Sequence, residues 1–134
     1  MKIYTAATFS EQARIRSCKE QLIKLGHTIT STWLEESLFV RPEGMPAEIF
    51  ERKMAMKDLN EIASADCVIL DLEKPSQTAG KMVEFGFALA KHKLIYTVGP
   101  KIPHAIFTLL SDQYFETWDK LFEHFAENHK VVGT

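Results

Sequence analysis

The chain has 134 residues and a formal net charge of −2, with 16 basic and 18 acidic residues mixed along its length. Hydrophobic residues make up 46% and charged residues 25%, a composition that excludes a disordered or fibrous protein. The sequence contains no basic tract, which argues against a partner that is a nucleic-acid polymer, because such binding relies on many phosphate contacts. A small anionic ligand remains compatible with this charge, since a few local donors can hold one phosphate.

The cysteines, the histidines and the apolar segments give no sign of a disulfide scaffold, a metal site or a membrane helix. Two cysteines are too few for a disulfide scaffold, and no stretch approaches the roughly 20 apolar residues of a membrane helix. The five histidines include no pair four residues apart and no HExxH motif. We therefore expect a cytoplasmic protein with no membrane association, no metal site and no cofactor.

The first third of the chain predicts a strand, a helix and a second strand. Residues 2–6 (KIYTA) are rich in β-branched and aromatic side chains, as strands are. Residues 11–25 predict a helix with Ser10 as its N-cap and Gly26 as its terminating glycine. The apolar positions of this helix recur every three or four residues and are Ile15, Cys18, Leu22 and Leu25. Residues 27–33 (HTITSTW) alternate and predict the second strand.

The middle of the chain predicts a long loop, a helix and a buried strand. Residues 35–46 are rich in proline and glycine and predict an irregular loop, of a length that is often functional. A helix follows over residues 46–64, with Pro46 in its first turn. Its expected buried stripe is Ala55, Leu59, Ile62 and Ala63. Residues 66–72 (DCVILDL) are almost all apolar in the centre, the pattern of a parallel strand covered on both faces.

The last part of the chain continues the alternation. A loop over residues 73–78 leads into a helix that contains residues 82–90, and residues 93–98 (KLIYTV) predict a fourth strand. The remaining predicted elements are a short helix near residues 104–110, an edge strand near residues 113–115 and a helix over residues 117–128. These lengths suit right-handed crossovers. The prediction is one α/β domain with a flavodoxin- or Rossmann-like three-layer fold and a mostly parallel five-stranded sheet.

One acidic residue conflicts with the helix in which it lies. Within residues 82–90 every side chain is apolar or glycine except Glu84, which predicts a buried helix that carries one carboxylate. Ligands of parallel sheets bind beyond the carboxyl ends of the strands, and Glu84 points back toward that end. Gly80, four residues earlier, leaves space above it. Two interpretations remain open: a carboxylate paired with Lys81, Lys91 or a neighbouring backbone group, or a functional carboxylate.

A second carboxylate, Asp58, lies beside the buried stripe of the preceding helix, where it also fits a solvated acid next to Lys57.

The ordered segments KDL (57–59), ADCVI (65–69) and TAGKMVEFGFA (78–88) resemble the nucleoside 2-deoxyribosyltransferase family and its deoxynucleoside 5′-monophosphate N-hydrolase relatives. MKIYTAATF resembles the first strand and binding loop of that family, and GHTITSTWL resembles a second strand found in it. The resemblance covers residues 1–118.

The resemblance implies that Glu84 is the nucleophile and Asp58 its supporting acid. Cleavage of an N-glycosidic bond develops oxocarbenium character, which a carboxylate can stabilise and capture. A second carboxyl can donate a proton to the leaving base or orient the nucleophile. The sugar then passes to water or to another base, and the expected substrate is a small nucleoside or nucleotide built on 2-deoxyribose. A nucleotide-binding sensor without turnover is the alternative.

The resemblance and the apolar residues Phe107, Leu109, Leu110, Tyr114 and Phe115 predict a homo-oligomer, most simply a dimer.

The remaining candidate residues would bind the substrate. Phe9 and Trp33 are expected either to stack on the base or to lie in the core. Asp71, at the end of the third strand, fits a sugar ligand or a turn residue equally well. Met82 or Phe9 would form an apolar wall against a 2′-hydroxyl. The first strand and its loop contribute Thr5 and Ala6.

An anionic group would meet a separate set of candidates. Ser76, Thr78 and the backbone around Gly80 lie at a predicted helix N-terminus, which favours anions. Arg14 could reach the same region, although a salt bridge to Glu11 explains it equally well.

Overall fold

The computed structural model describes residues 1–35, 40–74 and 79–132. Five strands form one sheet, in the order β2-β1-β3-β4-β5. These strands are β1 (Lys2–Ala6), β2 (Thr28–Ile29), β3 (Cys67–Asp71), β4 (Leu94–Val98) and β5 (Gln113–Phe115). The longer helices are α1 (Gln12–Lys24), α2 (Ala47–Ala63), α3 (Gly80–Ala90) and α4 (Trp118–Val132), and short 3-10 helices are η1 (Phe9–Glu11), η2 (Thr32–Glu35) and η3 (Ile106–Leu110). All strand pairs are parallel, which confirms the predicted α/β domain with its five-stranded sheet.

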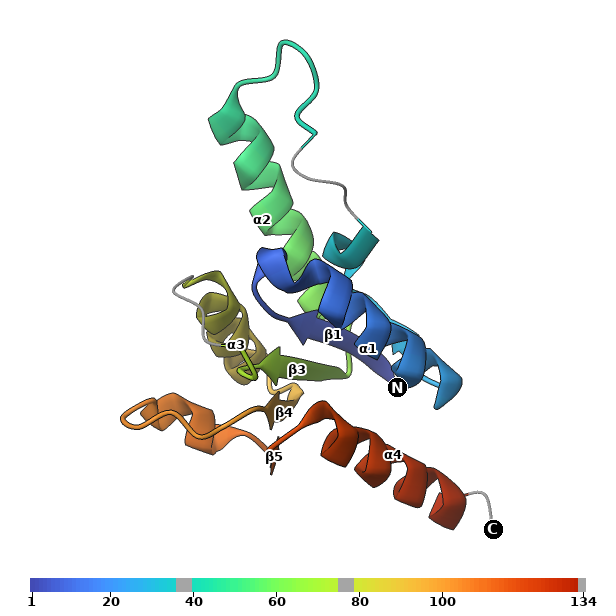
Figure 1. Ribbon diagram of the computed structural model, residues 1–134. Coiled ribbons are helices and arrows are strands. Elements are labelled where there is room, and N and C mark those ends of the chain that lie inside the picture. The colour runs from blue at the N-terminus through green and yellow to red at the C-terminus, as the bar shows by residue number, and fades with distance from the viewer. Residues whose placement is uncertain (36–39, 75–78, 133–134) are drawn as a thin grey trace.

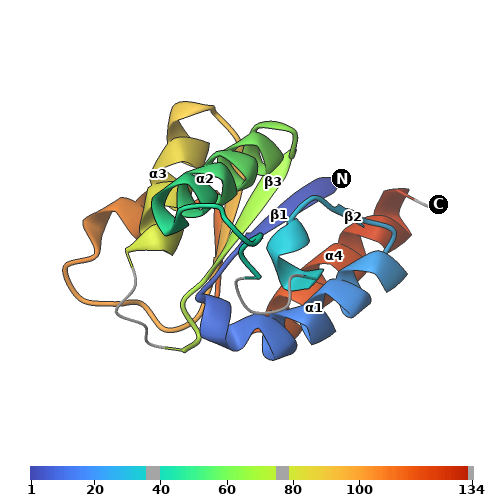
Figure 2. The same cartoon turned by 90° about the horizontal axis from the view of Figure 1, so that it is seen from above.

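The helices lie in two layers, one on each face of the sheet. Seen from above, α2 and α3 cover one face, and α1 and α4 cover the other (Figure 2). Every residue of β3 is buried, as expected for a central strand with helices on both sides. The strand order reverses between β1 and β3, which is where ligands bind in open sheets of this kind. Within the described residues, no helix is long and apolar enough to cross a membrane.

The predicted buried positions and C-terminal end of helix α1 are mostly confirmed. Three of its four predicted apolar positions, Ile15, Cys18 and Leu22, are buried, and Gly26 has a positive φ of 93° just after the helix. The prediction of Ser10 as the N-cap is wrong. The chain enters α1 through η1, so Ser10 lies inside that 3-10 turn and Glu11 occupies the capping position without a side-chain cap bond.

The second strand is much shorter than the predicted residues 27–33. It ends at Ile29, and the chain turns into η2 because Thr32 is bound by a side chain instead of a neighbouring strand. The backbone N–H of Thr32 donates to Oε1 of Glu61 at 3.0 Å, and its hydroxyl donates to Oε2 at 2.5 Å. These two bonds replace the strand pairing and place Trp33 on a 3-10 helix.

Helix α2 confirms its predicted bounds within one residue, with Pro46 in the N-cap position. Its predicted buried stripe is wrong, because among the four positions only Ile62 is buried, Leu59 is half-buried, and Ala55 and Ala63 are exposed. Figure 1 shows that α2 extends past the sheet, so that its N-terminal half has no sheet beneath it. Ala63 is instead the last residue of the helix. The expectation that α3 is buried all round is also wrong, since the side chain of Val83 is 62% exposed.

Gly99, directly after β4, lets two backbones approach each other. Its φ is 131°, and a Cβ at this position would lie 2.4 Å from the carbonyl carbon of Leu72. The Gly99 N–H donates to the carbonyl oxygen of Phe115 at 2.8 Å. The segments that follow β3 and β4 are therefore packed together at the carboxyl edge of the sheet, and only glycine fits there.

Candidate active site

A cavity of about 400 Å³ opens beside the loop that follows β1. Four parts of the fold form its walls: the end of β1 with its loop, η2, α2 and α3. Its lining includes Tyr4, Phe9, Trp33, Asp58, Lys81 and Glu84. The cavity thus lies next to the β1–β3 reversal point, where the topology places a ligand.

Glu84 lies in the wall of this cavity and receives a hydrogen bond from a tyrosine. The hydroxyl of Tyr4, a fully buried residue, donates to Oε2 of Glu84. Burial raises the pKa of Glu84 to about 7, against the lowering effect of the Tyr4 bond and with a further increase from the Asp58 carboxylate. Burial, followed by the charge of Glu84, raises the pKa of Tyr4 far above its usual range, so the tyrosine remains a donor.

The alternative pairing of Glu84 with a lysine is wrong. Nζ of Lys81 donates to the carbonyl oxygen of Asp71, and Nζ of Lys91 lies 5.5 Å above the ring of Phe87. The partner is instead Tyr4, which sequence reasoning missed. The available signal was a tyrosine within a predicted buried strand, because a buried tyrosine hydroxyl usually requires a hydrogen-bond partner.

Asp58 lies in the cavity lining and also pairs with Lys57. It lines the cavity from α2, and its Oδ1 accepts a hydrogen bond from Nζ of Lys57 at 3.2 Å, with 28% of its side chain exposed. Helices α2 and α3 pack against each other, so Asp58 and Glu84 reach the same cavity from neighbouring helices. The carboxylate of Asp58 acts on Glu84 through its charge, in the direction that keeps Glu84 protonated.

Two aromatic residues form another wall of the cavity. Trp33 is buried and its Nε1–H donates to the backbone oxygen of Thr5 at 2.8 Å, which fixes the indole. The ring of Phe9 lies 6.2 Å from that of Trp33 between centroids, tilted by 43°. Both residues line the cavity, so both remain available for a planar base.

A polar clamp joins the aromatic wall to the helix of Asp58. Thr32, the neighbour of Trp33, binds Glu61 of α2 through its backbone and its hydroxyl. Nζ of Lys57 donates to the hydroxyl oxygen of Thr32 at 3.1 Å and also to Asp58. The turn η2 and helix α2 are therefore connected by one set of bonds.

A family model for nucleoside 2-deoxyribosyltransferases matches residues 3–127. The chain belongs to this family. Membership makes it an enzyme of the class that comprises N-glycosidases and deoxyribosyltransferases. A search of the curated proteins found no match.

Solved structures share the fold of this family member. A 2-deoxyribosyltransferase from Bacillus psychrosaccharolyticus is 24% identical, with a TM-score of 0.75 over 91% of this chain and 90% of its own. A CMP N-glycosidase from Clostridium botulinum is 16% identical, with a TM-score of 0.60 over 94% and 98% of the two chains. A 2-deoxyribosyltransferase from Leishmania mexicana is 16% identical, with a TM-score of 0.55 over 96% and 98%.

Several predicted binding residues of the deoxyribosyltransferase site lie outside the cavity wall. Asp71 is buried, and it accepts hydrogen bonds from Arg14 at 2.5 Å and from Nε1 of Trp118 at 2.9 Å. Arg14 and Asp71 thus bind each other, and Asp71, as the last residue of β3, is bound by an arginine and an indole instead of serving as the turn residue that was the alternative. Met82 is not among the residues that line the cavity, so of the two residues proposed for the apolar wall only Phe9 lines it.

The other predicted binding residues divide into three groups. Gly80 lines the cavity. Thr5 and Ala6 are buried behind it, where the Thr5 hydroxyl lies 2.8 Å from that of Ser31. Ser76 and Thr78 lie outside the described residues.

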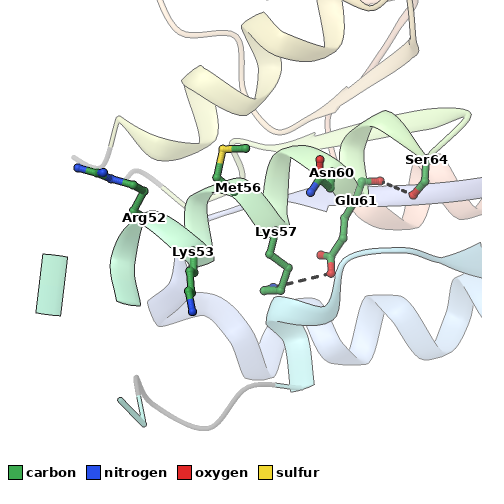
Figure 3. Close-up of a pocket in the computed structure, with 7 residues that line it drawn as sticks. All are labelled: Arg52, Lys53, Met56, Lys57, Asn60, Glu61 and Ser64. Carbon is green, nitrogen blue, oxygen red and sulfur yellow. Dashed lines mark hydrogen bonds and ion pairs between the residues drawn. The ribbon is translucent and has the colours of Figure 1, made fainter. Parts of the chain in front are cut away.

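A second hollow, of about 540 Å³, lies on the outer side of α2 (Figure 3). Its lining residues come from this helix and from Ser64, the residue that caps it, and they include Arg52, Lys53 and Lys57. Its carboxylate, Glu61, is already engaged by Thr32 and lies 3.8 Å from Nζ of Lys57. The lining residues thus contain no second carboxylate for glycosidic chemistry, and the cavity between α2, α3 and β1 is the candidate active site of this family member.

Proposed function

We propose that this protein cleaves the N-glycosidic bond of a deoxynucleoside or of its 5′-monophosphate, with Glu84 as the nucleophile. The observation that carries the proposal is the place of Glu84 in the cavity wall, with Tyr4 bonded to its carboxylate and Asp58 facing the same space. Family membership supports the reaction class. The aromatic wall of Phe9 and Trp33 suits a planar base.

In the first step, a carboxylate oxygen of Glu84 attacks the anomeric carbon of the sugar. A bond forms between this oxygen and the carbon, the bond from the carbon to the base nitrogen breaks, and its electron pair leaves with the base. Below about pH 7 the Glu84–Asp58 pair holds one proton, and in the reactive form Asp58 carries this proton and supplies it to the leaving base. The Tyr4 hydrogen bond favours the ionised form of Glu84 that the attack requires.

In the second step, an acceptor releases the sugar from Glu84. Water or the ring nitrogen of another base attacks the anomeric carbon, its proton passes to Asp58, and the ester bond to Glu84 breaks. Both carboxyl groups return to their starting states. Hydrolysis and transfer share the first step, so an assay of base release detects either reaction.

The preferred sugar is proposed to be 2-deoxyribose. Phe9 supplies apolar surface in the cavity and no hydrogen-bond partner for a 2′-hydroxyl. An unpaired buried hydroxyl lowers the rate by roughly 5- to 150-fold. The ratio of kcat/KM for matched deoxyribose and ribose substrates measures this preference, and a ratio near one or in favour of ribose would contradict the proposal.

The variant Glu84→Gln tests the proposed nucleophile, because the amide keeps the shape of the side chain and removes its charge. Base release from a panel of deoxynucleosides and their 5′-monophosphates, with and without an added base, is expected to fall by several orders of magnitude. Glu123→Gln, an exposed position on α4, is the matched control and should retain full activity. Near-normal activity of Glu84→Gln would refute the assignment, and wild-type protein that binds nucleotides without releasing base would instead indicate a sensor.

The functional unit is proposed to be a two-fold dimer. The apolar residues Ile106, Phe107, Leu109 and Leu110 of η3 are between 60% and 68% exposed, an unusual grouping for an isolated chain. Phe115, expected on the same surface, instead packs against Tyr96 in the core. Light scattering is expected to give about twice the chain mass of 15.3 kDa, and a single-chain mass at micromolar concentration would exclude the dimer.

A further inference from the structure

One lysine beside the cavity has at least three acceptors within reach of its ammonium group. Nζ of Lys57 donates to Oδ1 of Asp58 at 3.2 Å and to the hydroxyl oxygen of Thr32 at 3.1 Å. It also lies 3.8 Å from Oε2 of Glu61. The two carboxylates belong to α2, and the hydroxyl belongs to the turn that carries Trp33. Because an ammonium group has three donors, a small movement of this side chain changes which acceptor it holds most closely.

The two carboxyl groups of the cavity have different surroundings. Glu84 is bonded to the fully buried Tyr4, and burial raises its pKa to about 7. Asp58 has 28% of its side chain exposed and an ammonium group at 3.2 Å. Burial favours the protonated form of a carboxyl, whereas a neighbouring cation favours the ionised form. When the pair holds a single proton and Lys57 is bonded to Asp58, that proton is therefore expected on Glu84.

The charge of Lys57 distinguishes between the two carboxyls. Its lowering effect on the pKa of Glu84 is smaller than the effects of burial, of the Tyr4 bond and of the carboxylates of Asp58 and Glu61. Toward Asp58 it acts through a direct hydrogen bond. A change in the position of Nζ thus alters the proton affinity of Asp58 more than that of Glu84.

The other charged groups around the pair are held in different ways. Glu61 accepts two hydrogen bonds from Thr32, which fix its carboxylate between α2 and η2. Lys81 lines the cavity from α3, but its Nζ donates to the carbonyl oxygen of Asp71 at the end of β3. Lys57 differs from Lys81 in that it is bonded to one carboxyl of the pair and has acceptors to which it can withdraw.

We propose that Lys57 is a positioning residue that decides which of the two carboxyls carries their shared proton. With Nζ on Asp58, the proton rests on Glu84 and the proposed nucleophile is neutral. With Nζ withdrawn to Thr32 and Glu61, Asp58 takes up the proton and Glu84 becomes the anion that attacks the sugar. One proton changes its place, and the net charge of the pair stays the same. This inference rests on the proposed N-glycosidic activity of the same cavity.

Carbon NMR with labelled aspartate and glutamate carboxyls locates the proton without any substrate. In the wild type, the titration near pH 7 is expected on the carboxyl carbon of Glu84 and not on that of Asp58, with signals assigned through Glu84→Gln and Asp58→Asn. In Lys57→Met, the Asp58 carbon should take up part of this titration, whereas Lys57→Arg keeps the charge and the wild-type pattern. Lys53→Met, at an exposed position one turn earlier on α2, is the matched control. A wild-type titration on Asp58, or an unchanged pattern in Lys57→Met, would overturn the proposal.

The pH profile of base release separates this role from a purely structural one. Base release requires the proton that Asp58 supplies, so kcat/KM falls once the pair has lost it. Lys57→Met and Lys57→Gln remove a positive charge, so the pair keeps its proton to higher pH. The fall should move upward by roughly one pH unit, the low end of the range for a neighbouring charge, because 32% of the Lys57 side chain is exposed.

The outcomes distinguish this inference from the proposed function. A loss of kcat/KM that is equal at all pH values would show that Lys57 only supports the structure, and the proposal would be overturned. The expected NMR pattern without base release from any substrate would refute the proposed function alone. Base release with the same pH profile in the wild type and in both neutral variants of Lys57 would refute this inference alone.

Discussion

Replacing Glu84 by glutamine is expected to stabilise the protein above neutral pH and to have little effect on stability near pH 4. In the unfolded chain this carboxyl titrates near its ordinary pKa of 4.5, whereas burial in the folded protein raises the pKa to about 7. Between these values the folded protein binds a proton that the unfolded chain has lost. The stability of the wild type must therefore fall as pH rises through this window, and the glutamine variant lacks this loss.

The size of the effect follows from the two pKa values. Each pH unit across the window changes the free energy of unfolding by about 1.4 kcal/mol, so a shift from 4.5 to about 7 corresponds to about 3 kcal/mol. The amide oxygen of glutamine can still accept the hydrogen bond from Tyr4, so the substitution mainly removes the charge. The proposed nucleophile is thus expected to destabilise the fold at the pH at which it reacts.

Urea unfolding of the wild type and Glu84→Gln at pH 4.5 and pH 8 measures this difference, provided that the slope with denaturant is unchanged. The variant should match the wild type at the lower pH and exceed it by about 3 kcal/mol at the higher pH. Glu123→Gln, where 63% of the side chain is exposed, should show no such dependence on pH. A gain of equal size at both pH values, or no gain at pH 8, would refute the reasoning.

Three further substitutions test other parts of the structure. Asp58→Asn is expected to lower kcat/KM for base release by roughly 10²- to 10⁴-fold, the usual effect of one acid-base group, and an unchanged rate would make Asp58 a surface acid only. In the wild type, kcat/KM should fall as pH rises through about 7, because the Glu84–Asp58 pair then loses the proton that Asp58 supplies. Tyr4→Phe should move this fall to higher pH because the Tyr4 bond lowers the pKa of Glu84, and superimposable profiles would contradict that role. Gly99→Ala should destabilise the protein by on the order of 1–3 kcal/mol in urea unfolding, since its φ is 131° and its Cβ would lie 2.4 Å from Leu72, and wild-type stability would show that the loops can separate.

The sequence predicted most of the cavity because its signals are local. A single carboxylate in an apolar helix identified Glu84, and the order of the segments around it added Asp58, Phe9 and Trp33, all of which line the cavity. Tyr4 was missed because alternation along a strand predicts burial and does not identify the partner of a hydroxyl. That partner lies 80 residues away in the sequence.

The errors in the fold have long-range causes. The predicted strand over residues 27–33 is shortened by the bonds between Thr32 and Glu61, which belong to different elements. The predicted stripe of α2 follows helical spacing, but burial depends on how far the sheet extends beneath the helix, and α2 extends past it (Figure 1). Periodicity fixes the relative positions of residues on an element and leaves open where the neighbouring elements end.

The clamp between η2 and α2 affects how this site can be altered by design or by evolution. Thr32 holds the turn that carries Trp33, and through Glu61 and Lys57 it is joined to the helix that carries Asp58. Under the proposed mechanism, a substitution that moves Trp33 to admit a larger base would also shift the support of Asp58, the carboxyl proposed to act on the leaving group. Base range and proton transfer would then be coupled traits in this scaffold, and substitutions that broaden one would need compensating changes in the other.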